Sequence, residues 1–397
     1  MYMTRPLSLF KSRSRLLSTP VEGPGSGYLV LEGEEDIQYV RSSSGQEMID
    51  EALMDLPFPQ NRILTVNFTY GSGPYGKYTE KHNVLFIPVI NKPLSSHCFY
   101  LMVDDNNDHK GLAHTSSTEE DTEPSCLFRT CTRDRNPEKL NPHNNCQQFQ
   151  ILRKKAGRFS AKCVDPEGRP PMFLRRLGWN IHASKPKITL GEADGLNPIL
   201  RSQHPDFDFP LSTEYSQSMT VGKWYCPYMF IEEGTVKGQM ERSPFYEMTL
   251  EQQWERIFSC ERERERERES DDNSVCVRVV LPTELVKISW IDVVSQRDET
   301  NNRMWFWGMN KIGSQTRIGL SLVIIERIMW EQERVGWVAG NDKQVMVART
   351  ETYTGGDLWQ KFSCYVLVER FVLKRLDGSL VLTYEFKHTH RIKCKWE

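Results

Sequence analysis

Short runs of β-branched and aromatic residues, separated by turn residues, follow one another along most of this chain. Apolar runs of about 4–8 residues bounded by Gly, Pro, Asn or Asp are typical of strands rather than of helices. We therefore expect a protein built mainly from strands. The pattern predicts strands over residues 63–70, 84–90, 98–103, 224–232, 275–280, 285–294 and 304–307.

The end of the chain predicts a long β-hairpin. Residues 364–373 and 380–396 are both typical of strands, and Asp377-Gly378 between them is a strong hairpin signal. Because side chains alternate between the two faces of a strand, the even-numbered residues from Tyr384 to Trp396 are expected on one face.

Fewer segments show the pattern of a helix than show the pattern of a strand. Ser44-Gly45-Gln46-Glu47 fits a capping box ahead of an apolar helix face over 48–53. Apolar residues in 249–258 recur at helical spacing, and Ser321 and Gly336 suit the two ends of a helix over 321–335. The predicted fold class is α+β and β-rich, with mostly antiparallel sheets and about three or four helices.

A chain of 397 residues is long enough for roughly two or three domains. Residues 261–269 read ERERERERE, in which helical i+3 attractions and i+4 repulsions largely cancel and no apolar group can be buried. We interpret 260–274 as a frayed helix end and charged linker. It would separate an N-terminal β-rich half, 1–259, containing a mobile polar loop at 104–147, from a C-terminal β-rich half, 275–397.

Composition narrows the class of protein. Hydrophobic residues make up 38 % and charged residues 26 % of the chain, which is typical of folded proteins, and a net charge of −2 argues against a nucleic-acid partner. No apolar run approaches the roughly 18 residues of a transmembrane helix. Ten widely spaced cysteines without an apolar signal segment indicate reduced thiols and a cytoplasmic location, with plastid or nucleus as alternatives. The first twenty residues, rich in Ser and Arg, fit either a transit peptide or an ordered arm.

Two groups of residues are candidate metal ligands, with zinc as the cofactor. Cys126, Cys131, His143 and Cys146 place four soft ligands in the polar loop, although free thiols explain the same residues. His388 and His390 lie two apart on the last predicted strand and would need a third ligand from elsewhere. The alternative is a pair of hydrogen-bonded histidines on a mixed face.

One further motif, Gly71-Ser72-Gly73-Pro74-Tyr75-Gly76, matches the G-x-G-x-x-G pattern of dinucleotide-binding loops. A strand follows it where that fold needs a helix, so we interpret the motif as a flexible hairpin loop.

Several stretches together resemble a plant-specific family of uncharacterised proteins, a DUF1262-like domain-of-unknown-function family. The resemblance spans the chain and implies a land-plant source, an N-terminus that belongs to the mature protein, and an association with stress or defence. It implies no activity and no catalytic residues; His388 and His390 match the family pattern, whereas His143 and Cys146 match it poorly. The stretches are MYMTRPLS at 1–8, LPFPQN at 56–61, VLFIPVINKPLSS at 84–96, PPMFLRRLGW at 170–179, VGKWYCPYMFIEEG at 221–234, FYEMTLEQQWERIFSCE at 245–261 and GSLVLTYEFKHTHRIKCKWE at 378–397.

The leading hypothesis is a soluble, non-enzymatic protein of the plant cytosol that binds a protein or small-molecule partner. A metal-dependent enzyme or sensor is the first alternative, using His388 and His390 or the loop from Cys126 to Cys146. The second alternative is a protein that inserts the hairpin Cys364–Trp396 into a membrane, since a spanning strand needs about 9–11 residues.

Overall fold

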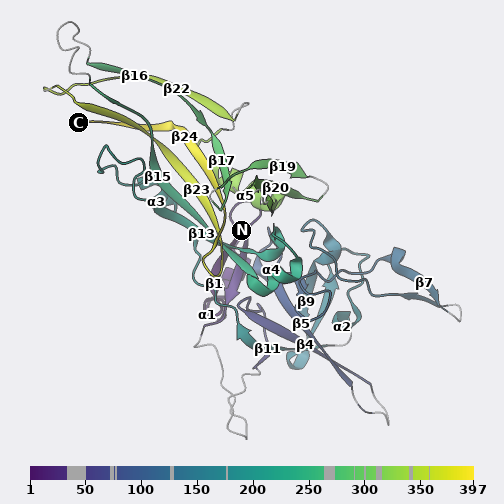
Figure 1. Cartoon of the computed structure of the whole chain (residues 1–397). Coiled ribbons are helices and arrows are strands. Elements are labelled where there is room, and N and C mark those ends of the chain that lie inside the picture. The colour runs from purple at the N-terminus through teal and green to yellow at the C-terminus, as the bar shows by residue number, and fades with distance from the viewer. Residues whose placement is uncertain are drawn as a thin grey trace.

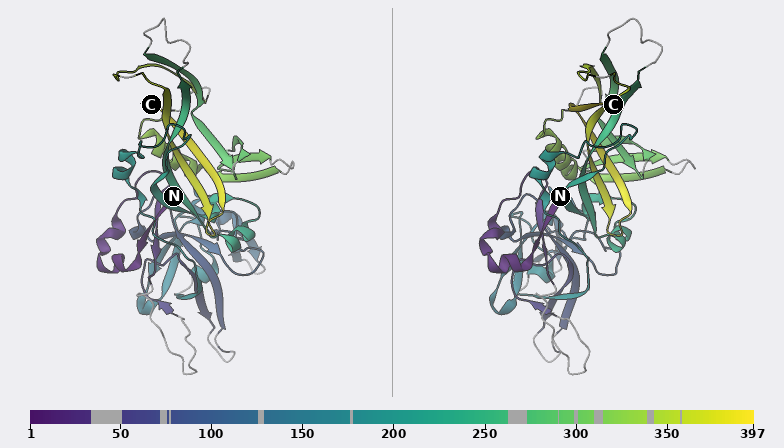
Figure 2. Two further views of the ribbon diagram at one scale, coloured as in Figure 1. Left: turned by 60° about the vertical axis from the view of Figure 1, so that its left-hand side comes forward. Right: turned by 90° about the vertical axis from the view of Figure 1, so that its left-hand side faces the viewer.

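The computed structural model describes residues 1–33, 51–71, 76, 78–125, 129–175, 178–262, 273–289, 291–298, 301–309, 315–338, 343–356 and 358–397. The molecule is elongated, with long strands at one end and a smaller sheet at the other (Figures 1 and 2). The N-terminus lies near the middle of the molecule and the C-terminus near the far end of the long strands.

The largest sheet has nine strands, in the order β18-β17-β24-β23-β15-β13-β1-β2, with β12 also paired to β13. Only β1 and β2 run parallel among its described pairs. Strands from both sides of residues 260–274 therefore share one hydrogen-bonded sheet. Its strands are β1 (Tyr2–Pro6), β2 (Gly27–Leu31), β12 (Gly195–Leu196), β13 (Met219–Pro227), β15 (Phe245–Glu261), β17 (Glu284–Ile288), β18 (Ile291–Asp292), β23 (Lys361–Arg375) and β24 (Leu380–Trp396).

Two further sheets and two ribbons complete the strands. The seven-stranded sheet runs β10 (Phe159–Cys163), β9 (Phe149–Arg153), β6 (Cys98–Val103), β5 (Tyr78–Pro88), β4 (Arg62–Tyr70), β11 (Asn180–Lys187), β3 (Glu51–Leu53). The four-stranded sheet runs β14 (Ile231–Glu232), β21 (Gln315–Ser321), β20 (Arg303–Met309), β19 (Val294–Asp298). The ribbons pair β16 (Ser274–Pro282) with β22 (Gln344–Thr352) and β7 (Thr122–Ser125) with β8 (Arg129–Thr132).

Helices are short and few in the described part of the chain: α1 (Leu7–Ser12), α2 (Met172–Arg175), α3 (Pro198–Gln203), α4 (Val236–Arg242) and α5 (Leu322–Glu333). The longest, α5, begins after Ser321 as predicted, but the Ser321 side chain makes no capping hydrogen bond. The helix ends at Glu333, shortly before Gly336 at φ +88°. The predicted β-rich α+β class with mostly antiparallel sheets is confirmed.

One apolar core joins the three larger sheets and α5. It contains residues from both sides of residues 260–274, and separate buried clusters lie within the seven-stranded sheet and along β23. Its buried members include Trp224 and Phe371 from the nine-stranded sheet, Leu85 and Tyr100 from the seven-stranded sheet, Phe306 and Leu320 from the four-stranded sheet, and Ile324 and Ile328 from α5.

The helix predicted over 249–258 is wrong, because these residues form the central part of strand β15. Leu250 and Trp254 are four residues apart, a spacing that fits one helix face and also two repeats of a strand. Hydrogen-bonded pairing with β13 on one side and β23 on the other stabilises these residues as a strand. Residues 51–53, expected at the end of a helix, likewise form β3.

The polar segment 104–147 is more ordered than predicted. Ala113 bridges to Met102 and Glu138, and the buried side chain of Gln147 donates to Thr115 Oγ1 and to the Lys139 carbonyl, both at 3.2 Å. Side-chain hydrogen bonds thus add to the packing of Ala113 and Leu140 in the large apolar core. Three predictions fall wholly or mainly outside the described residues: the capping box at 44–47, the charged run 261–269 and the glycine-rich loop 71–76.

The first residues are an ordered arm, one of the two interpretations of this segment. Strand β1 lies between β13 and β2, and the hydroxyl of the fully buried Tyr2 donates to the Pro88 carbonyl at 2.8 Å. No helix in the described ranges combines the length and apolar character that crossing a bilayer requires.

Leu250→Ala tests the central place of β15. Leu250 is fully buried in the large core, so its truncation is expected to lower the free energy of unfolding by about 2–5 kcal/mol. Met309→Ala, at a side chain that is 68 % exposed, is the control and should change it by no more than about 0.5 kcal/mol. Urea unfolding measures both, and equal small effects would contradict the assignment of Leu250 to the core.

Candidate functional site

His388 lies on β24, but the strand does not keep the regular alternation predicted for it. Leu367 pairs with His388, whereas its neighbour Val366 pairs with Ile392, so residues 389–391 form a bulge. Neighbouring residues of β23 face opposite sides, and their partners His388 and Ile392 therefore do so as well. The single face expected from Tyr384 to Trp396 is wrong for this reason.

The two histidines have different surroundings. His388 is 2 % exposed, and its Nε2 lies 3.6 Å from Glu369 Oε2, whereas His390 is exposed. Their ring centroids are 5.5 Å apart with the planes at 77°. Across the described residues, no three His, Cys, Asp or Glu side chains are grouped so as to hold a metal ion. A metal at this pair stays a prediction.

The cysteine loop is only partly described. Cys126 and the side chain of Cys131 lie outside the described part of the chain. His143 is exposed and Cys146 is buried, and burial raises the pKa of the Cys146 thiol to about 11. Zinc binding by this loop therefore also stays a prediction.

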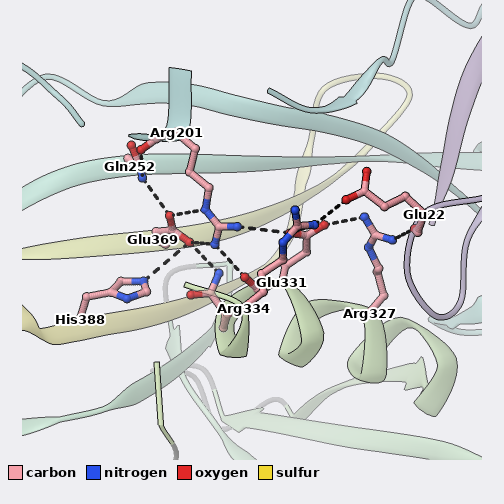
Figure 3. Close-up of polar contacts among 9 residues, drawn as sticks. Glu22, Arg201, Gln252, Arg327, Glu331, Arg334, Glu369 and His388 are labelled. Carbon is pink, nitrogen blue, oxygen red and sulfur yellow. Dashed lines mark hydrogen bonds and ion pairs between the residues drawn. The ribbon is translucent and has the colours of Figure 1, made fainter. Parts of the chain in front are cut away.

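Glu369 is the centre of a buried polar network (Figure 3). Its carboxylate accepts hydrogen bonds from Arg201 Nε at 2.8 Å and Arg201 Nη2 at 2.5 Å. The side-chain amides of Gln252 and Gln332 each donate to it at 2.8 Å. Four elements thus meet at one side chain of β23: α3 brings Arg201, β15 brings Gln252, α5 brings Gln332 and β24 brings His388.

Local sequence places Arg201 and the α5 residues. Asn197 caps α3 by accepting from the Leu200 N–H at 3.0 Å, and Pro198 takes the first helical position. On α5, Arg327 and Glu331 are four residues apart and form an ion pair at 2.5 Å. Both side chains are almost fully buried.

Glu331 extends the network toward the surface. It accepts from Arg201 Nη1 at 3.2 Å, and its other oxygen pairs with Arg327. Arg334 lies 3.7 Å from Glu331 and donates to Glu22 at 2.7 Å. Three arginines thus face three carboxylates, which is how buried charges avoid the large cost of desolvation.

This arrangement controls the ionisation of Glu369. Burial alone would raise the pKa of its carboxyl, but contact with His388 and hydrogen bonds from Arg201, with the charges of both, outweigh burial and hold the pKa well below its usual range. Glu369 is therefore a carboxylate whose oxygens are already occupied by donors.

A cavity of about 180 Å³ opens beside the network. Arg391, at its edge, is exposed and has no hydrogen-bond or ion-pair partner within the described residues. Apart from Glu369, none of the lining residues is acidic. The lining comprises Arg201, Gln252, Glu369 and His388 from the network, with Leu196, Pro198, Ser202, His204, Arg334, Val335, Leu367 and Arg391.

Two histidines next to this cavity have lowered pKa values, and burial is the largest cause for both. Burial lowers the pKa of His204, and the charges of Arg391 and Lys393 lower it further. Although the His390 side chain is largely exposed, its partial burial also lowers its pKa, with smaller effects from His388 and Arg391. Arg201 pairs with the one carboxylate of the lining, so no further acidic lining residue faces Arg334 and Arg391.

Sequence reasoning identified His388 but missed Arg201, Glu331 and Glu369. One signal was present: Glu369 interrupts an apolar strand, FSCYVLVERFVLKR, and Glu is almost never fully buried unless it is paired. A buried Glu indicates that a buried partner exists. It does not identify Arg201 as that partner, because α3 and β23 are far apart in the sequence.

Glu369→Gln tests the network. Because the pKa of Glu369 is lowered in the folded state, its stabilisation is complete above the unfolded pKa of about 4.3 and disappears as the pH falls below it. The variant is expected to lose about 3–5 kcal/mol of unfolding free energy at pH 7 and to depend less on pH between 5 and 3. Urea unfolding at several pH values measures this. Glu326→Gln, at an exposed position of α5, is the control and should keep the pH dependence of the wild type. If Glu369→Gln and the wild type depend on pH in the same way, the assignment of Glu369 to the network is contradicted.

No curated protein sequence matches the chain. A solved structure titled "Crystal structure of Cry35Ab1" is similar with a TM-score of 0.45 and 10% sequence identity, covering 85% of this chain and 90% of that chain. The model of a family described as "Protein of unknown function (DUF1262)" matches residues 22–127, which confirms over that segment the resemblance to this family.

Proposed function

We propose that this protein acts by binding a small anionic ligand, with a carboxylate or a phosphate group, in the cavity beside Glu369. The observation that carries the proposal is the imbalance of charge in the lining. Arg201, Arg334 and Arg391 are cations, and Glu369 is the lining's single carboxylate. Guanidinium groups bind planar or tetrahedral oxyanions through paired N–H donors.

The ligand would meet Arg391 first. This side chain is exposed and without a partner in the described part of the chain, so it loses no existing ion pair when an anion arrives. Arg334 already pairs with the 62 % exposed Glu22, a contact that solvent weakens. His204 supplies a third group that gains a proton more easily beside an anion.

The occupied oxygens and lowered pKa of Glu369 favour binding over catalysis at this cavity. A general base needs a free lone pair within reach of the proton that it removes. Arg201, Gln252 and Gln332 all donate to the Glu369 carboxylate, and its lowered pKa makes it a poor proton acceptor at neutral pH. A metal ion would be repelled by the same cations that favour an anion.

We also propose where in the cell this protein acts. The eight free cysteines in the described ranges suit a reducing compartment such as the cytosol. An association with stress or defence in a plant cell rests on the family resemblance alone. Insertion of the hairpin into a membrane is not proposed, because β23 and β24 are already paired to β15 and β17.

Arg391→Ala tests the proposed site. Isothermal titration of the full chain with citrate and phenyl phosphate should detect binding, and glucose should give none. The variant is expected to bind at least about tenfold more weakly, since a charge-assisted contact contributes roughly 1.5–3 kcal/mol. Arg278→Ala, at an exposed arginine of β16, is the matched control. The proposal would be overturned if neither citrate nor phenyl phosphate bound, or if Arg391→Ala and the wild type bound them with equal affinity.

The affinity for phenyl phosphate should also depend on pH. The pKa of His204 is below its ordinary value in the free protein, and a bound anion favours the protonated imidazole. Affinity is therefore expected to rise as the pH falls from 8 to 6, and His204→Gln should flatten this dependence. Titrations at constant ionic strength measure the effect, and an identical slope in the variant would exclude His204 as its source.

A further inference from the structure

Two cysteines face each other across the long hairpin. Cys364 of β23 and Cys394 of β24 are directly opposite in the register, and their Sγ atoms are 3.5 Å apart. A disulfide needs S–S near 2.05 Å, so the two sulfur atoms must approach each other by about 1.5 Å. Both are free thiols in this structure.

The pair combines one accessible and one protected thiol. Cys364 is fully buried, whereas Cys394 is half-buried and lies near the C-terminal end of β24. The Cys394 S–H donates to Cys364, and this hydrogen bond lowers the pKa of the Cys364 thiol and raises the pKa of the Cys394 thiol, so the pair loses its first proton at Cys364. An accessible thiol can react first with an external oxidant, and a thiolate held beside it can then close the bond.

The position of the pair links it to the cavity. The bulge at 389–391 separates the stretch of β24 that contains His388 from the stretch that contains Cys394. Arg391 belongs to this bulge, and the next residue, Ile392, pairs with Val366, two residues from Cys364. A covalent bond between the two cysteines would hold the β24 register immediately beyond the bulge.

We propose that Cys364 and Cys394 form a modification site that a small-molecule disulfide such as oxidised glutathione converts into a cross-strand disulfide. We further propose that this bond fixes the bulge that places Arg391 at the cavity. The consequence for ligand binding rests on the proposed function; the thiol chemistry and the effect on the bulge do not.

The reaction proceeds in two exchanges. Cys394 passes its proton to the Cys364 thiolate along the hydrogen bond between them and attacks one sulfur of oxidised glutathione. This forms a mixed disulfide and releases one glutathione thiolate, and Cys364 then loses the proton that it received. The Cys364 thiolate then attacks Cys394 Sγ, closes the protein disulfide and expels the second glutathione. The two protein thiols are oxidised by two electrons, and one oxidised glutathione becomes two molecules of reduced glutathione, which take up the two protons.

Other described cysteines provide internal comparisons. Cys276 is exposed on β16 and reports whether the oxidant is active. Cys146 and Cys163 interact with each other, and burial raises the pKa of both thiols, whereas the pair in the hairpin contains one thiol with a lowered pKa, Cys364. Peptide mapping distinguishes a bond at either pair.

The first experiment treats the reduced full chain with oxidised glutathione and maps its peptides by mass spectrometry. The expected product is a cross-linked peptide joining Cys364 and Cys394, with loss of two thiols there and reversal by dithiothreitol. Cys394→Ser should lack it, and Cys276→Ser should retain it. Glutathionylation of Cys276 with both hairpin cysteines still reduced would overturn the site, and so would a mixed disulfide at Cys394 that never resolves.

Hydrogen exchange of the same samples tests the effect on the bulge without any ligand. Oxidation should slow exchange at residues 389–396 in the wild type at least severalfold and leave Cys394→Ser unchanged. Equal exchange in oxidised and reduced wild type would overturn the effect on the bulge. Slower exchange together with no binding of phenyl phosphate in either state would support the disulfide and contradict the proposed function instead.

Discussion

The ion pair between Arg201 and Glu369 is the constraint on which the middle of this molecule depends. Both groups are almost fully buried, so each would be a costly isolated charge without the other. Satisfying them requires α3, α5, β15 and β24 to approach one point on β23. The network therefore fixes the relative positions of elements that apolar packing alone would hold with less precision.

The same pairing shapes the chemistry of the cavity. Because Arg201, Gln252 and Gln332 occupy the carboxylate of Glu369, the floor of the cavity offers little negative charge to an arriving ligand. The arginines at the edge, whose charges are only partly compensated, then determine the sign of the potential. In the proposed function, the same arrangement of charged side chains both satisfies the buried carboxylate and favours an anionic ligand at the cavity.

Local signals made part of this fold predictable. Asp377-Gly378 specifies a hairpin and Ser321 with Gly336 delimits α5, and the structure has both. Features that depend on distant partners were not predictable. The strand β15 resembles a helix until β23 is known, and the bulge of β24 is visible only in its register against β23. His388 was found by its spacing to His390, whereas its buried neighbour Glu369 required Arg201 from another region of the chain.

The shared nine-stranded sheet has a consequence for how the chain acquires its structure. Leu250 pairs with Phe371, so β15 lacks one neighbour until the last part of the chain has been synthesised. Long-range pairing of this kind raises the contact order, which slows folding and prolongs the exposure of unpaired strand edges. During synthesis, the first two-thirds of the polypeptide would present an open β15 edge, and a chaperone that covers such edges would be most useful at that stage.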